Sequence, residues 1–470
     1  PRLTPGIYNR PMTTALTGLP SRLPDIRFRQ AEEYINRDPG FHAENLKAGL
    51  MALPDSTEQV SRLLAYCNEN GIPVVAQGGR TGLSGAAVTR PAELILDTSG
   101  LCRISNLDPL GATVIAQAGV TLADLEAAAN GHGLSTGIDL AARDTATIGG
   151  MAATNAGGIE AFRRGVMRNR ILGLEVVLAD GSVINSLKRV SKANEGLDVT
   201  RLLVGSEGVL GIITRISLSL VTRDPPSVTA LCLFADTGCA AKGFATLRDS
   251  RTLSLLSAEA MWPAYFLGVA DALSIPRPLE VAPDSAALPV LLEAAVETEE
   301  QGECFEQSLM DLLQAGLVQD IVIARNERER RGFWRIREDS MVVDNLWPHG
   351  YWYDVSVPLD SLSAYVDSLH RRIGDISSEL QAFLIAHLGD GNIHATISAG
   401  KPVDALKDAI DNAVYLGLAE IGGSFSAEHG IGIDKKAALK REVSSERYQL
   451  MQRVRAAFDP KGILNPGKVL

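Results

Sequence analysis

The chain has little of what marks several large classes of protein. It contains only five cysteines, scattered at positions 67, 102, 232, 239 and 304, with no CxxC pair and no metal-ligand spacing. This usage predicts free thiols in a reducing compartment and argues against a disulfide framework. No apolar run approaches the roughly 18 residues that a bilayer-spanning helix needs, and the first residues lack a signal-peptide pattern. We therefore expect a soluble chain in the cytoplasm, or in an organelle matrix if a leader was removed.

Positive charge is also in short supply. The 45 lysines and arginines are outnumbered by 56 acidic residues, so the net charge is −11, and no basic run stands out. A nucleic-acid partner is therefore not expected. The hydrophobic content of 46% is ordinary for a globular protein. A length of 470 residues exceeds what one compact core organises, so we expect more than one domain.

Apolar periodicity and turn signals divide the chain into four parts. Helices alternate with short buried strands in the second part, and Asp180-Gly181 there is typical of a hairpin turn. The third part has several strands for each pair of amphipathic helices, which predicts a separate α+β domain with an antiparallel sheet. The parts are residues 1–41, an arm with one helical piece around 31–36; residues 42–222; residues 223–424; and residues 425–470, which contain a further helix over 445–458.

Three glycine-rich segments lie in the second part. The segment Gln77–Gly85 follows a predicted strand and offers a nest of backbone N–H groups for a pyrophosphate, although a plain tight loop fits it equally well. Its GGxxGxxG spacing is not the GxGxxG fingerprint. The segment Thr147–Gly158 is dense in glycine without any charge, which favours contact with a planar ligand, and Leu203–Thr214 repeats the theme. Together they predict one extended ligand of dinucleotide size.

Titratable groups gather near the C-terminal end of a chain that has only seven histidines. His387 and His394 flank a Gly-Asp-Gly-Asn turn after a strand-like segment, so the two-residue strand period can bring both imidazoles to one side. Glu428 would complete a three-ligand metal site with open positions. The adjacent His429 would point elsewhere and stay available for proton transfer. On these residues alone, a metal-dependent hydrolase is also a valid interpretation.

The glycine-rich segments, together with Gly173–Gly181, resemble the FAD-binding domain of the vanillyl-alcohol-oxidase superfamily, also called the PCMH-type fold. Within it the chain is most similar to the D-2-hydroxy acid dehydrogenase branch, and Phe458–Lys468 resembles the tail of that family. The resemblance implies an α+β architecture: a two-subdomain FAD-binding domain, an α+β substrate domain with an antiparallel sheet, and a C-terminal segment that returns to the FAD domain. It also implies oxidation of a D-2-hydroxy acid to the 2-oxo acid by hydride transfer to flavin N5.

The resemblance assigns FAD contacts to each loop. The loop Gln77–Gly85 would contact the pyrophosphate, and the loop Thr147–Gly158 would contact the ribityl chain and the isoalloxazine ring. Glu207 and Ile212 would lie near the adenine end. Because Arg80 stands in the loop where some superfamily members carry a tethering histidine, non-covalent FAD is expected. The expected FAD-binding residues are Gln77, Gly78, Gly79, Arg80, Thr81, Gly82, Ser84, Gly85, Asp139, Thr147, Gly149, Gly150, Thr154, Asn155, Gly157, Gly158, Glu207, Gly211, Ile212 and Asn465.

Roles at the reacting end follow from the same branch. Its two histidines and glutamate bind a divalent metal, commonly zinc, and the next histidine is the base; these positions here are His387, His394, Glu428 and His429. Asn392 matches a residue that contacts substrate. Arg337, within Phe333–Glu338, matches an arginine that binds a substrate carboxylate, and this role is preferred over the alternative of a surface ion pair with Glu338 or Asp339.

Two positions depart from the hydroxyglutarate enzymes. There, a threonine four residues after the arginine and a lysine before a Tyr-Asp pair also bind the distal carboxylate; here Met341 and Trp352 stand at those positions. Replacing a lysine by an indole removes a charge and adds apolar surface. The substrate expected is therefore a short or apolar D-2-hydroxy acid such as D-lactate, or D-malate through Arg337. A D-2-hydroxyglutarate dehydrogenase proper and a non-catalytic flavoprotein are the alternatives.

No NAD fingerprint appears in the sequence. Electrons would therefore pass to a quinone or an electron-transfer flavoprotein. A homodimer is compatible with this interpretation.

Overall fold

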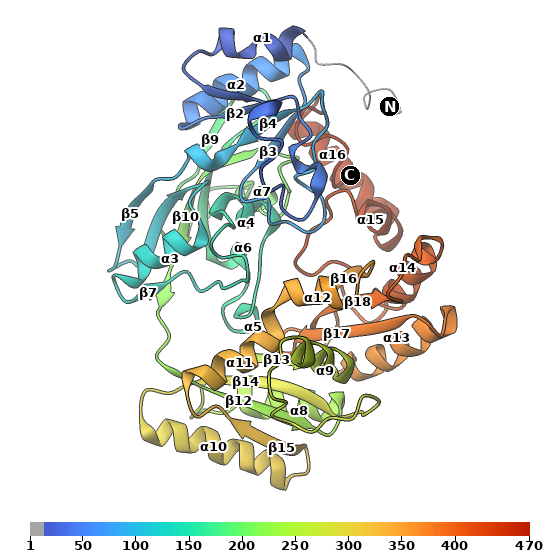
Figure 1. The fold of residues 1–470 in the computed structure, drawn as a ribbon. Helices are drawn as coiled ribbons and strands as arrows, with labels where there is room; N and C mark the ends of the chain where they lie inside the picture. The colour runs from blue at the N-terminus through green and yellow to red at the C-terminus, as the bar shows by residue number, and fades with distance from the viewer. Residues whose placement is uncertain (1–13) are drawn as a thin grey trace. The chain divides into compact units, whose positions relative to one another are not determined.

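The computed structural model describes residues 14–470, apart from the side chains of Thr14, Ser340 and Met341. Its contacts divide the chain into two compact units. The first unit consists of the chain up to Gly158, Arg164–Arg223 and Glu428–Leu470; the second consists of Ile159–Arg163 and Asp224–Ala427. The first unit therefore combines the blue-to-green start of the chain with its red end (Figure 1).

A four-stranded sheet in the order β1-β2-β4-β3 forms one half of the first unit. Its strands are β1 (Arg27–Gln30), β2 (Leu50–Leu53), β4 (Leu94–Asp97) and β3 (Val74–Gln77). Strand β1 runs antiparallel to β2, whereas β2 and β3 run parallel to β4. The helix α2 (Thr57–Asn70) packs Val60, Leu63 and Leu64 into the core, and Gly71 ends it in the left-handed conformation at φ 63°.

The helical piece expected around residues 31–36 is a short 3-10 helix over Ala31–Glu33, but residues 14–30 hold two elements that were not predicted. That stretch contains the helix α1 (Thr14–Arg22) and the strand β1. The β1 sequence Arg-Phe-Arg-Gln gives no apolar alternation because none of its side chains is fully buried. Its extended form comes from pairing with β2, which is a contact that local sequence does not encode.

A five-stranded antiparallel sheet in the order β5-β6-β10-β8-β9 forms the other half of the first unit. The predicted turn at Asp180-Gly181 joins β8 to β9 and is confirmed: the Leu178 amide donates to the Ser182 carbonyl over 2.9 Å. The strands are β5 (Ile104–Asp108), β6 (Thr113–Gln117), β10 (Ile212–Ser219), β8 (Ile171–Val177) and β9 (Val183–Asn185), and β7 (Leu134–Ser135) pairs separately with β11 (Val221–Thr222).

Helices and the tail complete the first unit. One hydrophobic core runs under both sheets, and the tail residue Leu464 forms a bridge to Val74 of β3. The remaining helices are α3 (Leu122–Asn130), α4 (Ile148–Thr154), α5 (Ala161–Arg164, which crosses the unit boundary), α6 (Met167–Arg170), α7 (Thr200–Leu203), α15 (Lys436–Glu442) and α16 (Ser445–Phe458).

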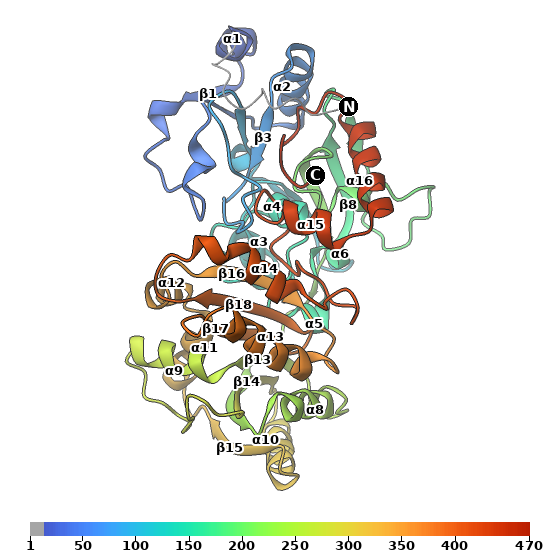
Figure 2. The same ribbon diagram turned by 90° about the vertical axis from the view of Figure 1, so that its right-hand side faces the viewer.

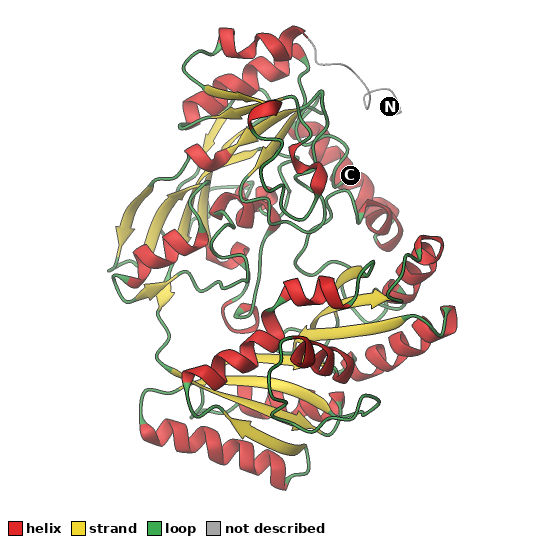
Figure 3. Ribbon diagram, in the orientation of Figure 1, coloured by secondary structure: helices red, strands yellow, loops and turns green. Residues whose placement is uncertain are grey.

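The second unit is built on a seven-stranded antiparallel sheet, as predicted, with helices on both faces (Figures 2 and 3). In spatial order its strands are β15 (Val318–Ile323), β12 (Ser227–Phe234), β14 (Leu288–Ala295), β13 (Leu255–Met261), β17 (Gln381–His387), β18 (Asn392–Ser398) and β16 (Tyr351–Ser356). Helices α9 (Pro263–Ala272), α11 (Glu327–Glu338) and α12 (Ser340–Leu346) pack on one face, and α8 (Thr237–Arg248), α10 (Glu299–Gln314), α13 (Leu362–Ile376) and α14 (Lys407–Tyr415) complete the unit.

The sheet register determines which side chains share a face. Glu259 of β13 pairs directly with His387 of β17, and Ile385 pairs with His394 of β18. Because side chains alternate along a strand, Glu259, His387 and His394 all point to the face that carries α9 and α11. Within residues 14–470, no helix combines the length and the apolar character that crossing a bilayer requires.

Candidate functional site

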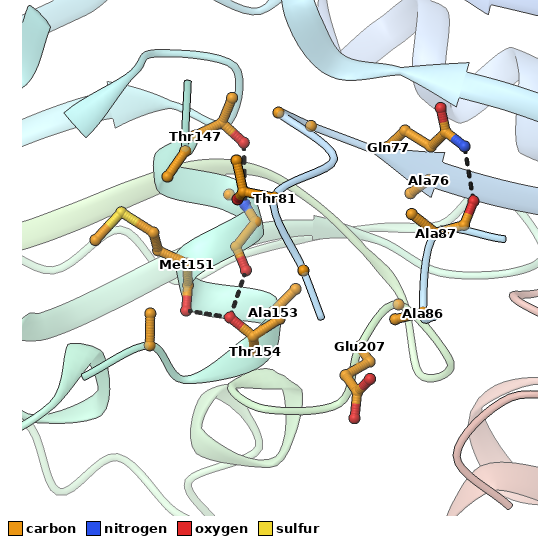
Figure 4. Close-up of a pocket in the computed structure, with 18 of the residues that line it drawn as sticks. Ala76, Gln77, Thr81, Ala86, Ala87, Thr147, Met151, Ala153, Thr154 and Glu207 are labelled. Atoms are coloured by element: carbon orange, nitrogen blue, oxygen red, sulfur yellow. Dashed lines mark hydrogen bonds between the residues drawn. The ribbon is translucent and has the colours of Figure 1, made fainter. Parts of the chain in front are cut away.

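The first unit contains a cavity where the three glycine-rich loops meet. Its volume is about 1370 Å³ when the open mouth is included. Gln77 and Thr81 line it from the first loop, Thr147 and Thr154 from the segment around α4, and Glu207 from the third loop (Figure 4). The prediction that loops far apart in sequence surround one extended ligand site is consistent with this arrangement.

Glycines let the first loop pack tightly against the segment that leads into α4. A Cβ at Gly78 would lie 2.1 Å from Oγ1 of Thr147, and one at Gly79 would lie 1.9 Å from the carbonyl oxygen of Thr145. Both distances are far below van der Waals contact, so any larger residue would push the loops apart. Thr147 caps α4 by accepting the Gly150 amide at 3.3 Å.

The cavity wall is mostly backbone and small side chains. Gln77 is held in place because its amide nitrogen donates to the carbonyls of Asn45 (2.6 Å) and Ala87 (2.8 Å). Among the described residues that line the cavity, Arg80 is the one cationic side chain and His429 the one imidazole, and no cysteine is present. His42 bonds the first loop through the Leu83 carbonyl at 3.2 Å but does not line the cavity.

Sixteen of the twenty residues expected to bind FAD line this cavity. The other four do not line it, and the structure gives their contacts elsewhere. Ser84 bonds the Gly430 carbonyl at 3.3 Å, and Gly85 adopts φ 72° where a Cβ would strike Ile433. Asp139 forms a two-point ion pair with Arg143, and Asn155 ends α4 and accepts the Arg168 amide.

Several lining residues were missed from the sequence. Most are small apolar side chains, such as Ala76, Ala118 and Ala153, that carry no chemical signal. Glu428 and His429, predicted for metal binding and proton transfer, line the cavity as well.

Glu207 anchors the loop that follows His429. It is 5% exposed, and its carboxylate oxygens accept the amides of Ile431 (2.7 Å) and Gly432 (2.8 Å). Burial raises the pKa of Glu207, and the two amide hydrogen bonds oppose that shift. The tail joins the same point, because Asn465 donates to the Glu207 carbonyl at 2.7 Å. Glu207, which had been expected near the adenine end, thus holds the 428–432 loop at the cavity.

The second unit brings its two predicted metal ligands together. The rings of His387 and His394 lie 5.3 Å apart between centroids and are nearly perpendicular. The expectation that strand period and turn place them on one side is confirmed. Nδ1 of His394 lies 3.9 Å from Oδ1 of Asp354 on the neighbouring strand β16.

Arg337 is a buried residue of α11, only 7% exposed. Its Nη2 lies 2.7 Å from Oε2 of Glu259 and 3.4 Å from the ring nitrogens of His387. The interpretation of Arg337 as half of a surface ion pair with Glu338 or Asp339 was therefore wrong; Arg335 is the residue that pairs with Asp339. Glu259 was missed, although a lone carboxylate in the apolar run Leu255–Met261 was a signal that could have identified it.

The other predicted substrate contacts lie on the same sheet. Asn392 is buried and donates to Oδ1 of Asp354 (2.9 Å) and to the Val355 carbonyl (3.1 Å). Trp352 lies two residues before Asp354 on β16, so it shares the face of His394, and it packs in a cluster with Phe383. The side chain of Met341 lies outside the described residues.

Comparison with known proteins identifies the family. Residues 223–469 match the C-terminal domain of FAD-linked oxidases, and residues 48–186 match an FAD-binding domain. The chain is 36% identical over 424 residues to a probable mitochondrial D-2-hydroxyglutarate dehydrogenase of Oryza sativa subsp. japonica (90% of this chain, 75% of that one). It is 31% identical over 430 residues to the D-2-hydroxyglutarate dehydrogenase of Stutzerimonas stutzeri (89% and 90%), and 33% identical over 436 residues to a putative mitochondrial D-lactate dehydrogenase of Schizosaccharomyces pombe (90% and 82%).

The chain belongs to the FAD-linked D-2-hydroxy acid dehydrogenases. It is thus a flavoprotein oxidoreductase, and the cavity lined by the three loops belongs to its FAD-binding domain. The hydrolase alternative has no support from these relatives.

Solved structures agree on the fold of this dehydrogenase. The chain resembles p-cresol methylhydroxylase with a TM-score of 0.73 at 16% identity, covering 97% of each chain. It resembles the 4-ethylphenol oxidase of Gulosibacter chungangensis with a TM-score of 0.72 at 18% identity, covering 98% of each chain. The predicted PCMH-type, vanillyl-alcohol-oxidase fold is confirmed.

Proposed function

We propose that the chain uses FAD and a divalent metal, such as Zn²⁺, to oxidise a short or apolar D-2-hydroxy acid to its 2-oxo acid. The observation that carries this proposal is the juxtaposition on one sheet face of the paired imidazoles of His387 and His394 with the buried guanidinium of Arg337. Two ligand-type nitrogens beside a buried cation suit a small hydroxy acid, which offers a hydroxyl and a carboxylate.

The metal would be held by His387, His394 and Glu428. A further contact favours the third ligand: the amide of Ala427, the residue before Glu428, donates to Oδ2 of Asp354 at 3.0 Å. Asp354 is also the cross-strand partner of His394. When bound, the metal supplies a Lewis acid for the substrate oxygens and FAD supplies a two-electron acceptor.

Three side chains of this chain would act on the substrate. One imidazole nitrogen of His429 takes the hydroxyl proton while Cα loses its hydrogen as hydride, so that a C=O bond replaces the C–O single bond. Arg337 binds a substrate carboxylate; its Nε is buried without a hydrogen-bond partner in the described part of the chain. The Oδ1 atom of Asn392 is also buried without a hydrogen-bond partner among the described residues, and it could accept a hydrogen bond from the substrate.

Apolar surface beside this group favours a short or apolar substrate. Trp352 shares the face of His394, and the rings of Trp347 and Phe383 stack at 3.9 Å within the same cluster. A second carboxylate would have to be desolvated against these rings. D-malate stays a candidate because Arg337 could bind its second carboxylate. The names of the relatives favour D-2-hydroxyglutarate as the second candidate.

Anaerobic reduction of the flavin separates these substrates. We expect D-lactate, D-malate or an apolar D-2-hydroxy acid to bleach the flavin faster than D-2-hydroxyglutarate, and the L-isomers to leave it oxidised. Faster reduction by D-2-hydroxyglutarate would select the second candidate, and no reduction by any member of the panel would reject the proposed activity.

Metal removal tests the other half of the proposal. Dialysis against a chelator should abolish turnover while the flavin spectrum remains, and added Zn²⁺ should restore turnover. Full activity after the metal content falls to zero would reject the metal.

Acid precipitation should release the yellow flavin into the supernatant, since FAD is proposed to be non-covalent. A quinone and an electron-transfer flavoprotein are the proposed acceptors, and their reduction rates can be compared directly.

A further inference from the structure

Glu259 holds a position between two proposed functional groups. Its side chain is 1% exposed, and its cross-strand partner is His387. Nδ1 of His387 lies 3.0 Å from Oε1 and 2.9 Å from Oε2 of Glu259, while Nη2 of Arg337 lies 2.7 Å from Oε2. One buried carboxylate therefore contacts both the proposed metal ligand and the proposed carboxylate-binding residue.

An ionised carboxylate can only accept hydrogen bonds, so the nitrogen of His387 that faces it must carry a proton. The proton is then fixed on Nδ1, and Nε2 keeps its lone pair. A metal-binding imidazole needs one such lone pair, and the hydrogen bond on its other nitrogen fixes both the tautomer and the ring orientation. Glu259 thus selects the form of His387 that can bind a metal.

The same carboxylate forms an ion pair with Arg337, in which Nη2 lies 2.7 Å from Oε2 without hydrogen-bond geometry. Because Nη2 faces Glu259, the guanidinium is held by α11 on one side and by β13 on the other, and its direction is set before a substrate binds. We propose that Glu259 is a positioning residue that fixes the His387 tautomer and orients Arg337, so that metal binding and carboxylate binding share one buried anchor. This inference rests on the proposed function.

A second buried glutamate on the same face provides a matched control. Glu293 of β14 is 5% exposed and contacts the same helix, because it accepts from Arg330 (2.9 Å) and from the indole of Trp334 (2.7 Å). It also accepts from the hydroxyl of Ser227. The variants Glu259→Gln and Glu293→Gln therefore remove equivalent buried charges beneath α11, and only the first touches the proposed site.

The main measurement is Zn²⁺ affinity of the metal-free flavoprotein, by competition with a chromophoric chelator. In Glu259→Gln the amide NH₂ would face either Nδ1 of His387, moving its proton to Nε2, or the guanidinium. We expect Zn²⁺ affinity to fall about 10- to 100-fold in Glu259→Gln and to change less than about twofold in Glu293→Gln. Equal affinities in Glu259→Gln and wild type would overturn the proposal, as would an equal loss in both variants.

A second measurement needs neither a variant of Glu259 nor a bound metal. Nitrogen-15 NMR of histidine-labelled wild type distinguishes a protonated nitrogen from one with a lone pair, and His387→Asn identifies the His387 signals. We expect the proton on Nδ1 in the metal-free protein; a proton on Nε2 would overturn the role of Glu259. If wild type binds no Zn²⁺, the metal part of the proposed function fails, while this measurement still decides the tautomer.

Discussion

The anchor at Glu207 makes a quantitative prediction about the loop that carries Glu428 and His429. Replacing Glu207 by alanine removes both acceptors of the Ile431 and Gly432 amides in a buried position. A buried donor left without a partner costs about 1–3 kcal/mol. Two such donors imply that Glu207→Ala lowers the free energy of unfolding of the first unit by about 2–6 kcal/mol.

The variant Glu207→Gln is the internal comparison. Its amide keeps one acceptor oxygen, so the loss should be about half as large as in the alanine variant. Urea denaturation followed by flavin fluorescence measures the stability, and steady-state turnover reports whether His429 stays in place. A loss below about 0.5 kcal/mol in Glu207→Ala, or equal losses in both variants, would refute the reasoning. Unchanged turnover with lowered stability would show that the anchor serves folding alone.

Three further predictions concern separate parts of the chain. Burial lowers the pKa of Lys468 from its ordinary 10.5 to about 8, so between these pH values the unfolded state binds one more proton than the folded state. The free energy of unfolding of wild type should therefore rise by about 3 kcal/mol relative to Lys468→Met as the pH rises from 8 to 10.5. Chemical denaturation at each pH measures this difference. Arg337→Lys should raise KM about 10- to 100-fold through loss of the planar fork, with the flavin spectrum unchanged; an unaltered KM would remove Arg337 from the substrate site. Trp352→Lys should shift kcat/KM about tenfold towards D-2-hydroxyglutarate over D-lactate, and a shift the other way would contradict the role given to the indole.

Local patterns predicted the parts of the site that depend on glycine and on strand period. The segments Gln77–Gly85 and Thr147–Gly158 are recognisable because close packing at these loops excludes residues larger than glycine. The resulting density of glycine is visible in the sequence. The juxtaposition of His387 and His394 followed from a period of two and one turn.

The missed features depend on contacts between distant segments. Glu259 faces His387 only because β13 pairs with β17, and the sequence around Glu259 carries no record of that register. The strand β1 is recognisable only beside β2. Asp139 and Asn155 were assigned to FAD by the family resemblance, which carries no information on their contacts with Arg143 and the Arg168 amide.

The division of the first unit into separated stretches of chain bears on the order of events during synthesis. Glu428, His429 and Asn465 line the cavity, and Leu464 bridges to Val74, yet these residues leave the ribosome only after the whole second unit has been made. During synthesis, the cavity of the FAD-binding domain therefore lacks these residues until the second unit has been made. We therefore expect flavin loading to depend on the last stretch of chain, and a protein truncated before residue 428 should lack its cofactor even where its glycine loops have formed.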